Sequence, residues 1–179
     1  MIGYSDAEYS PGSGNPPRLG WAFFHPDLSL PLARTCLLDD STVDSWKPRS
    51  QQIFPAETFA VLAALVTHAA LLKGCDILWF VDNEAACSTL IRGASREEDV
   101  HLIAEITHWT AMKMDVRIWI EWIDSSSNPS DGLSREGLLC PRFGHIASAV
   151  HEPDWAELSA SFQTLEGLAD IGESPSQAP

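Results

Sequence analysis

Four acidic residues lie where the sequence predicts that a strand ends or a helix begins. Asp6 is near the end of the first predicted strand, and Glu57 is in the first turn of a long apolar helix. Asp82 closes a short apolar strand, and Asp131 is in the first turn of a short final helix. Ligand sites in sheet-based folds form where strands end and loops begin, so we expect these four carboxylates to converge.

Four carboxylates at one place would repel one another and could not all ionise at low cost. A hard divalent cation removes this conflict, and oxygen ligands suit Mg²⁺, with Mn²⁺ as a substitute. No His or Cys belongs to the group, which disfavours zinc. Two such ions, about 3.5–4 Å apart, hold the attacking water and the leaving oxygen of a phosphodiester displacement. The four residues therefore indicate metal-dependent phosphodiester hydrolysis.

Each of these acidic residues also has a purely structural interpretation. Asp6 could be an ordinary strand-end residue, and the helix dipole favours Glu57 in a first turn whatever the function. Asp82 with Asn83 is a common strand exit and helix cap, and Asp131 could simply complete an N-cap. The functional interpretation depends on all four together, in this order along the chain.

Length and charge limit the classes of protein to consider. The chain has 179 residues, of which 45% are hydrophobic, so it can form one domain with a real core and a tail. Its formal net charge of −14 argues against a protein that grips nucleic acid or anionic lipid by bulk positive charge.

No apolar run reaches the roughly 18–20 residues that span a bilayer, so we expect no membrane partner. No signal peptide opens the chain. The four cysteines have spacings that fit neither a zinc knuckle nor a dense disulfide framework. We interpret them as reduced thiols of an intracellular protein, in the cytoplasm, the nucleus or a particle. The oligomeric state stays open.

The predicted elements follow the order β β β α β α α β α. Strands are expected at 1–9, 19–25, 32–38, 76–81 and 115–123. Helices are expected at 55–72, up to residue 92, from 95 to about 114, and after residue 129. We expect residues 39–52 to be irregular, and Ser95 with Glu98 to form a capping box. The pattern predicts an α/β fold with a five-stranded mixed sheet, three leading antiparallel strands, and helices packed on both faces.

The sequence motifs around the four acids resemble those of the ribonuclease H domain of retroelement reverse transcriptases. The similar segments are YSDAEYS at 4–10, LGWAF at 19–23, IFPAE at 53–57 and FVDNEAA at 80–86. The most specific is NPSDGLSR at 128–135, which resembles the family's Asn-Pro-x-Asp-x-x-Ser-Arg segment. The resemblance covers about residues 2–137 and implies a ribonuclease H-like fold.

The resemblance also implies a reaction and a role for each acid. The reaction is cleavage of the RNA strand of RNA–DNA hybrids with two metal ions, as part of reverse transcription. Asp6 would bridge both ions, and Glu57 and Asp82 would complete the site of one. Asp131 would hold the ion that activates water. Two features are absent. The loop 124–128 has no His, which cellular ribonucleases H usually carry there, and this implies slower turnover or product release without loss of the chemistry. A basic protrusion that would grip the hybrid is also missing.

Several residues beside the acids are candidates for contacts to the hybrid. Strand discrimination would use the RNA 2′-hydroxyl groups. The candidates are the Ala7 backbone, Gln51, Gln52, Asn83 and, for phosphate, Arg135. A polymerase domain of the same polyprotein would supply the remaining grip.

We expect a ribonuclease H-like domain over residues 1–140 and an acidic C-terminal extension over 141–179. Residues 151–179 carry six acids and no base, and their apolar spacing predicts a helix at 154–168 before a mobile end. Two alternative functions stay open at this point. One is another nuclease on the same fold that acts on DNA or RNA, and the other is a non-catalytic structural or interaction module derived from a reverse transcriptase.

Overall fold

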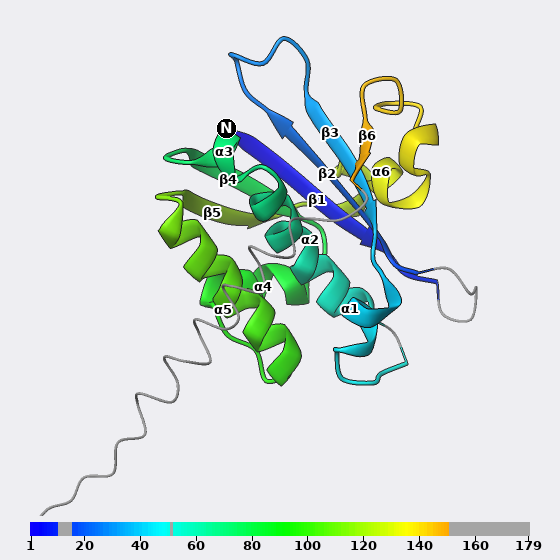
Figure 1. The fold of residues 1–179 in the computed structure, drawn as a ribbon, viewed down its shortest axis with the longest axis vertical. Helices are drawn as coiled ribbons and strands as arrows, with labels where there is room; N and C mark the ends of the chain where they lie inside the picture. Colours follow the sequence, from blue (N-terminus) through cyan, green and yellow to red (C-terminus); the bar gives the residue numbers. More distant parts are fainter. Residues whose placement is uncertain (11–15, 51, 151–179) are drawn as a thin grey trace, which may run out of the picture.

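The computed structural model describes residues 1–10, 16–50 and 52–150 of the chain. A six-stranded mixed sheet forms its centre, in the order β5-β4-β1-β2-β3-β6 (Figure 1). The strands are β1 (Ile2–Glu8), β2 (Arg18–Phe24), β3 (Leu32–Leu37), β4 (Asp76–Val81), β5 (Arg117–Trp122) and β6 (Ser148–Val150). The first three pair antiparallel, whereas β4 pairs parallel with β1, β5 with β4, and β6 with β3. The predicted α/β fold with three leading antiparallel strands is confirmed.

The predicted count of five strands was wrong, because β6 adds a sixth beside β3. Three residues are too few to show the alternation that identifies a strand from sequence. β6 lies beyond residue 140, and the expected domain boundary there stays a prediction. The helix expected at 154–168 and the mobile end lie outside the described residues.

Helices cover both faces of the sheet, as expected. They are α1 (Asp40–Asp44), α2 (Ile53–Thr67), α3 (Ala69–Leu72), α4 (Glu84–Arg92), α5 (Glu98–Lys113) and α6 (Asp131–Arg135). Short 3-10 turns, η1 (Ser125–Ser127) and η2 (Gly137–Leu139), flank α6. One face packs against α2, with α4 and α5 behind it, through Leu19, Trp21 and Phe23 of β2. The other face packs against α6, where Leu133 lies on Ala22 and Ala33.

Side-chain hydrogen bonds explain two local differences from the sequence prediction. The stretch 39–52 is not wholly irregular, because Asp39 accepts a hydrogen bond from the Thr42 backbone N–H at 2.6 Å and starts α1. The expected capping box at Ser95 and Glu98 does not form. The N-cap of α5 is Glu97 and not Ser95, so Glu98 is the first residue of the helix. Ser95 Oγ instead accepts a hydrogen bond from the backbone N–H of Glu97 at 3.2 Å.

The helix expected to reach Leu72 stops at Thr67, and His68 separates α2 from α3. The His68 ring is buried against the sheet, where its Nε2 accepts a hydrogen bond from Trp21 Nε1 at 3.0 Å. His68 has a non-helical backbone, with φ −116° and ψ 25°. The break is therefore associated with a buried polar contact that periodicity alone does not reveal.

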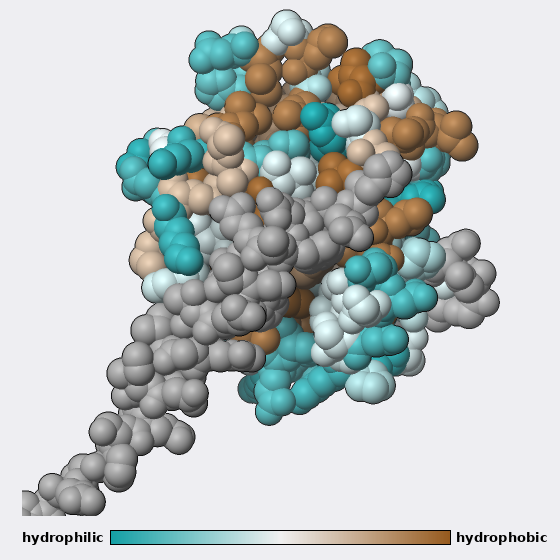
Figure 2. All heavy atoms as spheres, viewed as in Figure 1, coloured by the Kyte–Doolittle hydropathy of each residue, from teal (hydrophilic) through white to brown (hydrophobic). Residues whose placement is uncertain are grey.

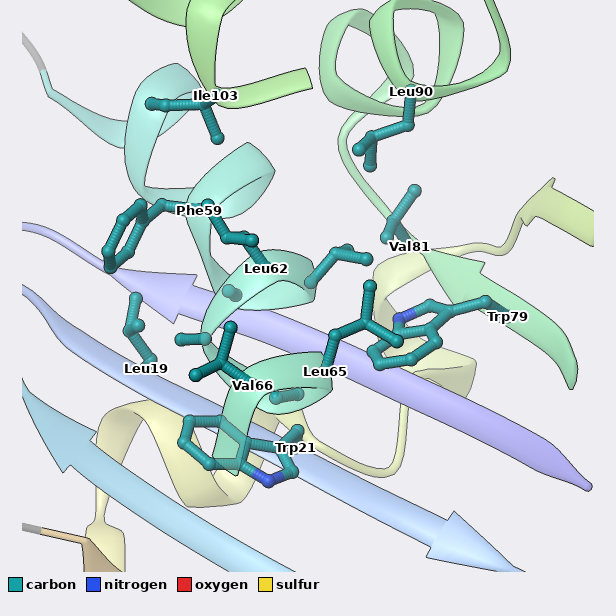
Figure 3. Packing of buried hydrophobic residues seen from close by; sticks show 14 of the residues in the cluster. Leu19, Trp21, Phe59, Leu62, Leu65, Val66, Trp79, Val81, Leu90 and Ile103 are labelled. Atoms are coloured by element: carbon teal, nitrogen blue, oxygen red, sulfur yellow. The ribbon is translucent and has the colours of Figure 1, made fainter. Parts of the chain in front are cut away.

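The core lies between the sheet and α2 (Figure 3). The helix is buried on nearly all sides, because α5 covers the side that faces away from the sheet. Leu62 and Leu65 of α2 contribute to the same cluster as Trp21 and Trp79, and all four are fully buried. Such a helix leaves little room for a charged side chain, which makes the buried Glu57 near its N-terminus unusual.

The surface at the start of α5 is mostly hydrophilic, as the lower end of the face in Figure 2 shows. Ion pairs join the segment after α1 to this helix, with Lys47 Nζ 2.9 Å from Glu98 and Arg49 2.8 Å from Asp99. These pairs hold the chain that leads into α2. None of the helices among the described residues is long and apolar enough to cross a membrane.

We predict that His68 makes the fold sensitive to acid. Burial, and then the charge of Arg34, lower the pKa of His68 from 6.5 to about 4. The unfolded chain therefore binds this proton first, and the free energy of unfolding falls by roughly 3 kcal/mol as the pH drops from 6.5 to 4. His68→Gln keeps an acceptor for Trp21 but does not titrate. Thermal melts at pH 4 and 6.5 should show a smaller difference for this variant, and an equal difference would contradict the prediction.

Candidate active site

Three acidic side chains from separate elements meet at one end of the sheet. Asp6 lies on the central strand β1, and Asp82 comes directly after β4. Glu57 lies just past the first turn of α2, because this helix begins at Ile53 and not at residue 55 as the sequence predicted. One carboxylate oxygen from each lies within 4.8 Å of the others. The parallel pairing of β1 and β4 explains the meeting of Asp6 and Asp82, because it brings the carboxyl ends of both strands to the same edge.

The carboxylates of this group are poorly supplied with hydrogen-bond donors. Asp6 is 5% exposed and Glu57 is 4% exposed. Glu57 Oε2 and Asp82 Oδ1 are buried and have no hydrogen-bond partner. An isolated buried charge is costly unless it is paired or binds a metal ion. Asp6, Glu57 and Asp82 therefore form a group of oxygen ligands that could hold a divalent cation.

The pKa values of two of these groups are raised. Burial, followed by the charge of Asp82, raises the pKa of Asp6 from 3.8 to about 7. Burial, followed by the charges of Asp6 and Asp82, raises the pKa of Glu57 well above its usual value. The Glu57 and Asp6 carboxyl groups also lie close enough for a hydrogen bond, which would need one shared proton. A bound cation would replace that proton and neutralise the group.

Asp131 lies outside this group of three. Its Oδ1 is 2.8 Å from Arg135 Nε, one helical turn further along α6. The charge of Asp131 nevertheless contributes to the raised pKa of Asp6, so the two carboxylates lie near each other. The structure thus brings three of the four predicted ligands together and places the fourth beside them, in an ion pair.

Close packing holds α6 over Asp6. Gly20 pairs with Asp6 across β1 and β2, and a Cβ atom at residue 20 would lie 2.5 Å from the Ser134 backbone nitrogen. This close approach allows Ser134 Oγ to donate a hydrogen bond to Asp6 Oδ2. Thr35 Oγ1 of β3 donates to the Leu133 carbonyl at 3.0 Å. The position of α6, and with it that of Asp131, is therefore determined by the sheet.

The turn before α6 is fixed in the same way. Asn128 is buried, and its Nδ2 donates to the Ser5 carbonyl at 3.0 Å. Its Oδ1 accepts from the Ser130 N–H at 3.1 Å and from Ser130 Oγ at 2.6 Å. Asn128 thus connects the turn before α6 to Ser5 of β1, the residue that precedes Asp6. The sequence motif contains Asn128 and Ser134, but its spacing alone did not reveal these positioning roles.

The residues expected to contact a hybrid have varied surroundings. The Ala7 backbone N–H hydrogen-bonds Glu57, and the Asn83 side chain caps α4 by accepting from the Ala86 N–H at 3.0 Å. Gln52 is buried between Arg49 and the Lys47 carbonyl. Gln51 lies outside the described residues, and Arg135 is exposed and pairs with Asp131 as above. A role for these residues in binding stays a prediction.

A residue that the sequence did not single out for the site lies beside Asp82. Trp122 Nε1 donates to the Asp82 carbonyl at 3.0 Å, which anchors the strand exit that carries this ligand. The indole ring is 47% exposed. Periodicity places Trp122 on a sheet face, but it does not reveal a contact with the neighbouring strand exit.

Comparison with solved structures identifies the fold. No protein-family model and no curated protein sequence matches the chain. Ribonuclease H1 of the halophilic archaeon Halobacterium salinarum is 19% identical, with a TM-score of 0.55 over 76% of this chain and 96% of that one. The N-terminal ribonuclease H domain of a Mycobacterium tuberculosis protein, solved as a fusion with maltose-binding protein, is 16% identical, with a TM-score of 0.52 over 76% and 92% of the two chains. The chain therefore has a ribonuclease H-like fold.

We predict that the metal-free protein loses stability as the pH rises. The raised pKa values of Asp6 and Glu57 mean that the folded chain keeps protons which the unfolded chain releases above about pH 4. Asp82→Asn removes one charge that faces both groups. In chelating buffer at pH 8 this variant should have a higher melting temperature than the wild type. Each kcal/mol gained in the free energy of unfolding corresponds to about 2–4 °C.

The difference between this variant and the wild type should shrink toward pH 5 and reverse in excess Mg²⁺, which the wild type binds better. The exposed Asp27→Asn serves as the control for removal of one charge. A lower melting temperature for Asp82→Asn in chelating buffer would contradict the clustering of charge at this site.

Proposed function

We propose that this protein is a divalent-metal-dependent endonuclease that cleaves the RNA strand of RNA–DNA hybrids. The observation that carries the proposal is the group Asp6, Glu57 and Asp82, which lies within 4.8 Å and contains buried oxygens without partners. The ribonuclease H-like fold supports the same reaction, since two solved proteins of this fold are named as ribonuclease H.

The side chains suit Mg²⁺ or Mn²⁺, because all of them offer oxygen ligands. Asp6, Glu57 and Asp82 would hold one ion, and Asp131 together with Asp6 would hold a second. When bound, the ions supply Lewis-acid chemistry to the attacking water and the leaving oxygen. The formal net charge of the chain is −14, which would repel a phosphate backbone. Bound cations would reverse the local field at the site and so attract the phosphates.

Neighbouring residues of the chain orient the carboxyl groups of this site. Ser134 and the Ala7 N–H hold Asp6 and Glu57 through hydrogen bonds, so the two carboxyl groups are preorganised before substrate arrives. Arg135 pairs with Asp131 at 2.8 Å and is itself exposed. In the proposed complex this guanidinium would pair with a substrate phosphate, and Asp131 would then be free to hold a cation.

We also propose that the reaction takes place during reverse transcription. The motif at 128–135 supports a role in reverse transcription, with a polymerase domain of the same polyprotein as partner. The low content of basic residues supports such a partner, because hybrid binding by this chain alone should be weak and sensitive to salt. The rival functions are another nuclease activity on this fold and a non-catalytic module.

We predict that Asp82→Asn lowers the rate of hybrid cleavage by about 10²-fold or more, because it removes a charged ligand. The rate is measured under single-turnover conditions in Mg²⁺, with circular dichroism to show that the fold persists. Asp27→Asn is the matched control and should cleave like the wild type. Equal rates for Asp82→Asn and wild type would refute the site assignment.

The preferred substrate is tested with one labelled RNA strand in three pairing states. The strand is presented in an RNA–DNA hybrid, in duplex RNA and single-stranded, with labelled duplex DNA as a fourth substrate. The proposal requires cleavage of the hybrid in Mg²⁺ or Mn²⁺, none in chelator, and products with 5′-phosphate ends. Preferential cleavage of duplex DNA would favour the rival nuclease. Intact substrates in every metal, with a folded protein, would favour the non-catalytic module.

A further inference from the structure

The strand β5 forms one end of the sheet, and no strand of the described residues lies beyond it (Figure 1). Four of its six residues are exposed, and Trp119 is 67% exposed. An edge strand presents unpaired N–H and C=O groups, which makes it a template for pairing with another chain. The side chains of β5 indicate which chain would fit.

The pairing with β4 determines which residues of β5 direct their backbone groups outward. The N–H of Arg117 donates to the Cys75 carbonyl, and the N–H of Ile123 donates to the Val81 carbonyl, each at 3.0 Å. In a parallel pair, alternate residues direct both backbone groups to the same neighbour. The odd-numbered residues of β5 therefore bond to β4, and the even-numbered residues direct N–H and C=O groups to the open edge.

A second copy of β5 fits this edge in antiparallel register centred on Trp119. Ile118 of one copy then lies opposite Ile120 of the other, and both present outward backbone groups for a hydrogen-bonded pair. Trp119 lies opposite Trp119, in the type of pair where side chains approach most closely. Arg117 lies opposite Glu121 of the second copy, and two-fold symmetry repeats this opposite-charge pair.

We propose that the protein forms a two-fold symmetric dimer through antiparallel pairing of β5. The segment Arg-Ile-Trp-Ile-Glu at 117–121 is self-complementary in charge, in apolar character and in backbone direction. Trp119 also lines an open, mainly apolar pocket of about 420 Å³ with Met1, Leu78 and Ile118, beside the ion pair of Asp76 and Arg117, and the second indole ring would lie against this pocket. The dimer does not depend on the proposed nuclease activity.

One strand pair buries less surface than a standard stable interface, and two copies of charge −14 repel each other. We therefore expect a transient dimer, with a dissociation constant on the order of 100 µM. Such weak association is measured by analytical ultracentrifugation of the full chain, from about 10 µM to about 500 µM.

Charge exchange at the predicted pair tests the register. Glu121→Arg places two Arg–Arg contacts in the dimer, and Arg117→Glu places two Glu–Glu contacts there. Each variant alone should dimerise at least about tenfold more weakly than the wild type. An equimolar mixture of the two variants restores opposite charges at both contacts, so it should associate about as strongly as the wild type.

Glu105→Arg on α5 is the matched control for Glu121→Arg, because it changes the net charge by the same amount away from β5 and should leave the dimer unchanged. Circular dichroism checks the fold of each variant, since Arg117→Glu also removes an ion pair with Asp76. Three results would overturn the dimer: a wild type that stays monomeric over the whole range, association unaffected by Glu121→Arg, or a mixture that associates no better than its components.

Discussion

Electrostatic repulsion among three closely spaced carboxylates is the constraint on which the rest of the site depends. Asp6, Glu57 and Asp82 share a space of 4.8 Å, and the first two are almost fully buried. Burial and the neighbouring negative charge disfavour the ionised form, so the pKa of Asp6 rises to about 7. A fold retains this arrangement at a cost in stability. That cost is most readily explained if a cation removes the repulsion in the working state.

The architecture around β1 is what makes this arrangement possible. Parallel pairing with β4 brings Asp82 to the end of β1, and the N-terminal part of the apolar helix α2 places Glu57 beside them. On the opposite face, Gly20 lets α6 approach closely enough for Ser134 to reach Asp6. The site thus depends on packing on both faces of the sheet, and an open or single-layered sheet could not build it.

The sequence predicted five of the six strands, the fold class and the convergence of Asp6, Glu57 and Asp82, because these follow from strong periodicity and from carboxylates at element ends. It also predicted Asp131 in the same group, whereas the structure places Asp131 beside the group in an ion pair with Arg135. The sequence did not reveal the contacts that fix them, such as Asn128 to the Ser5 carbonyl. This hydrogen bond and that of Ser134 to Asp6 join residues more than 100 positions apart, and a local pattern contains no information about such pairs. The six-stranded sheet escaped prediction for a related reason, since β6 is recognisable only by its pairing with β3.

The charges of the molecule divide into two kinds with different consequences. Exposed carboxylates such as Glu98 and Glu97 lie beside Lys47 and Arg49, where solvent screens them and their contribution to stability is small. The carboxylates at the end of β1 are shielded from solvent, so their field is concentrated where a phosphate would have to approach. A polyanion can bind there only after cations have reversed that field. Under the proposed function, metal binding and substrate binding at this site would therefore be thermodynamically linked, and each should strengthen the other.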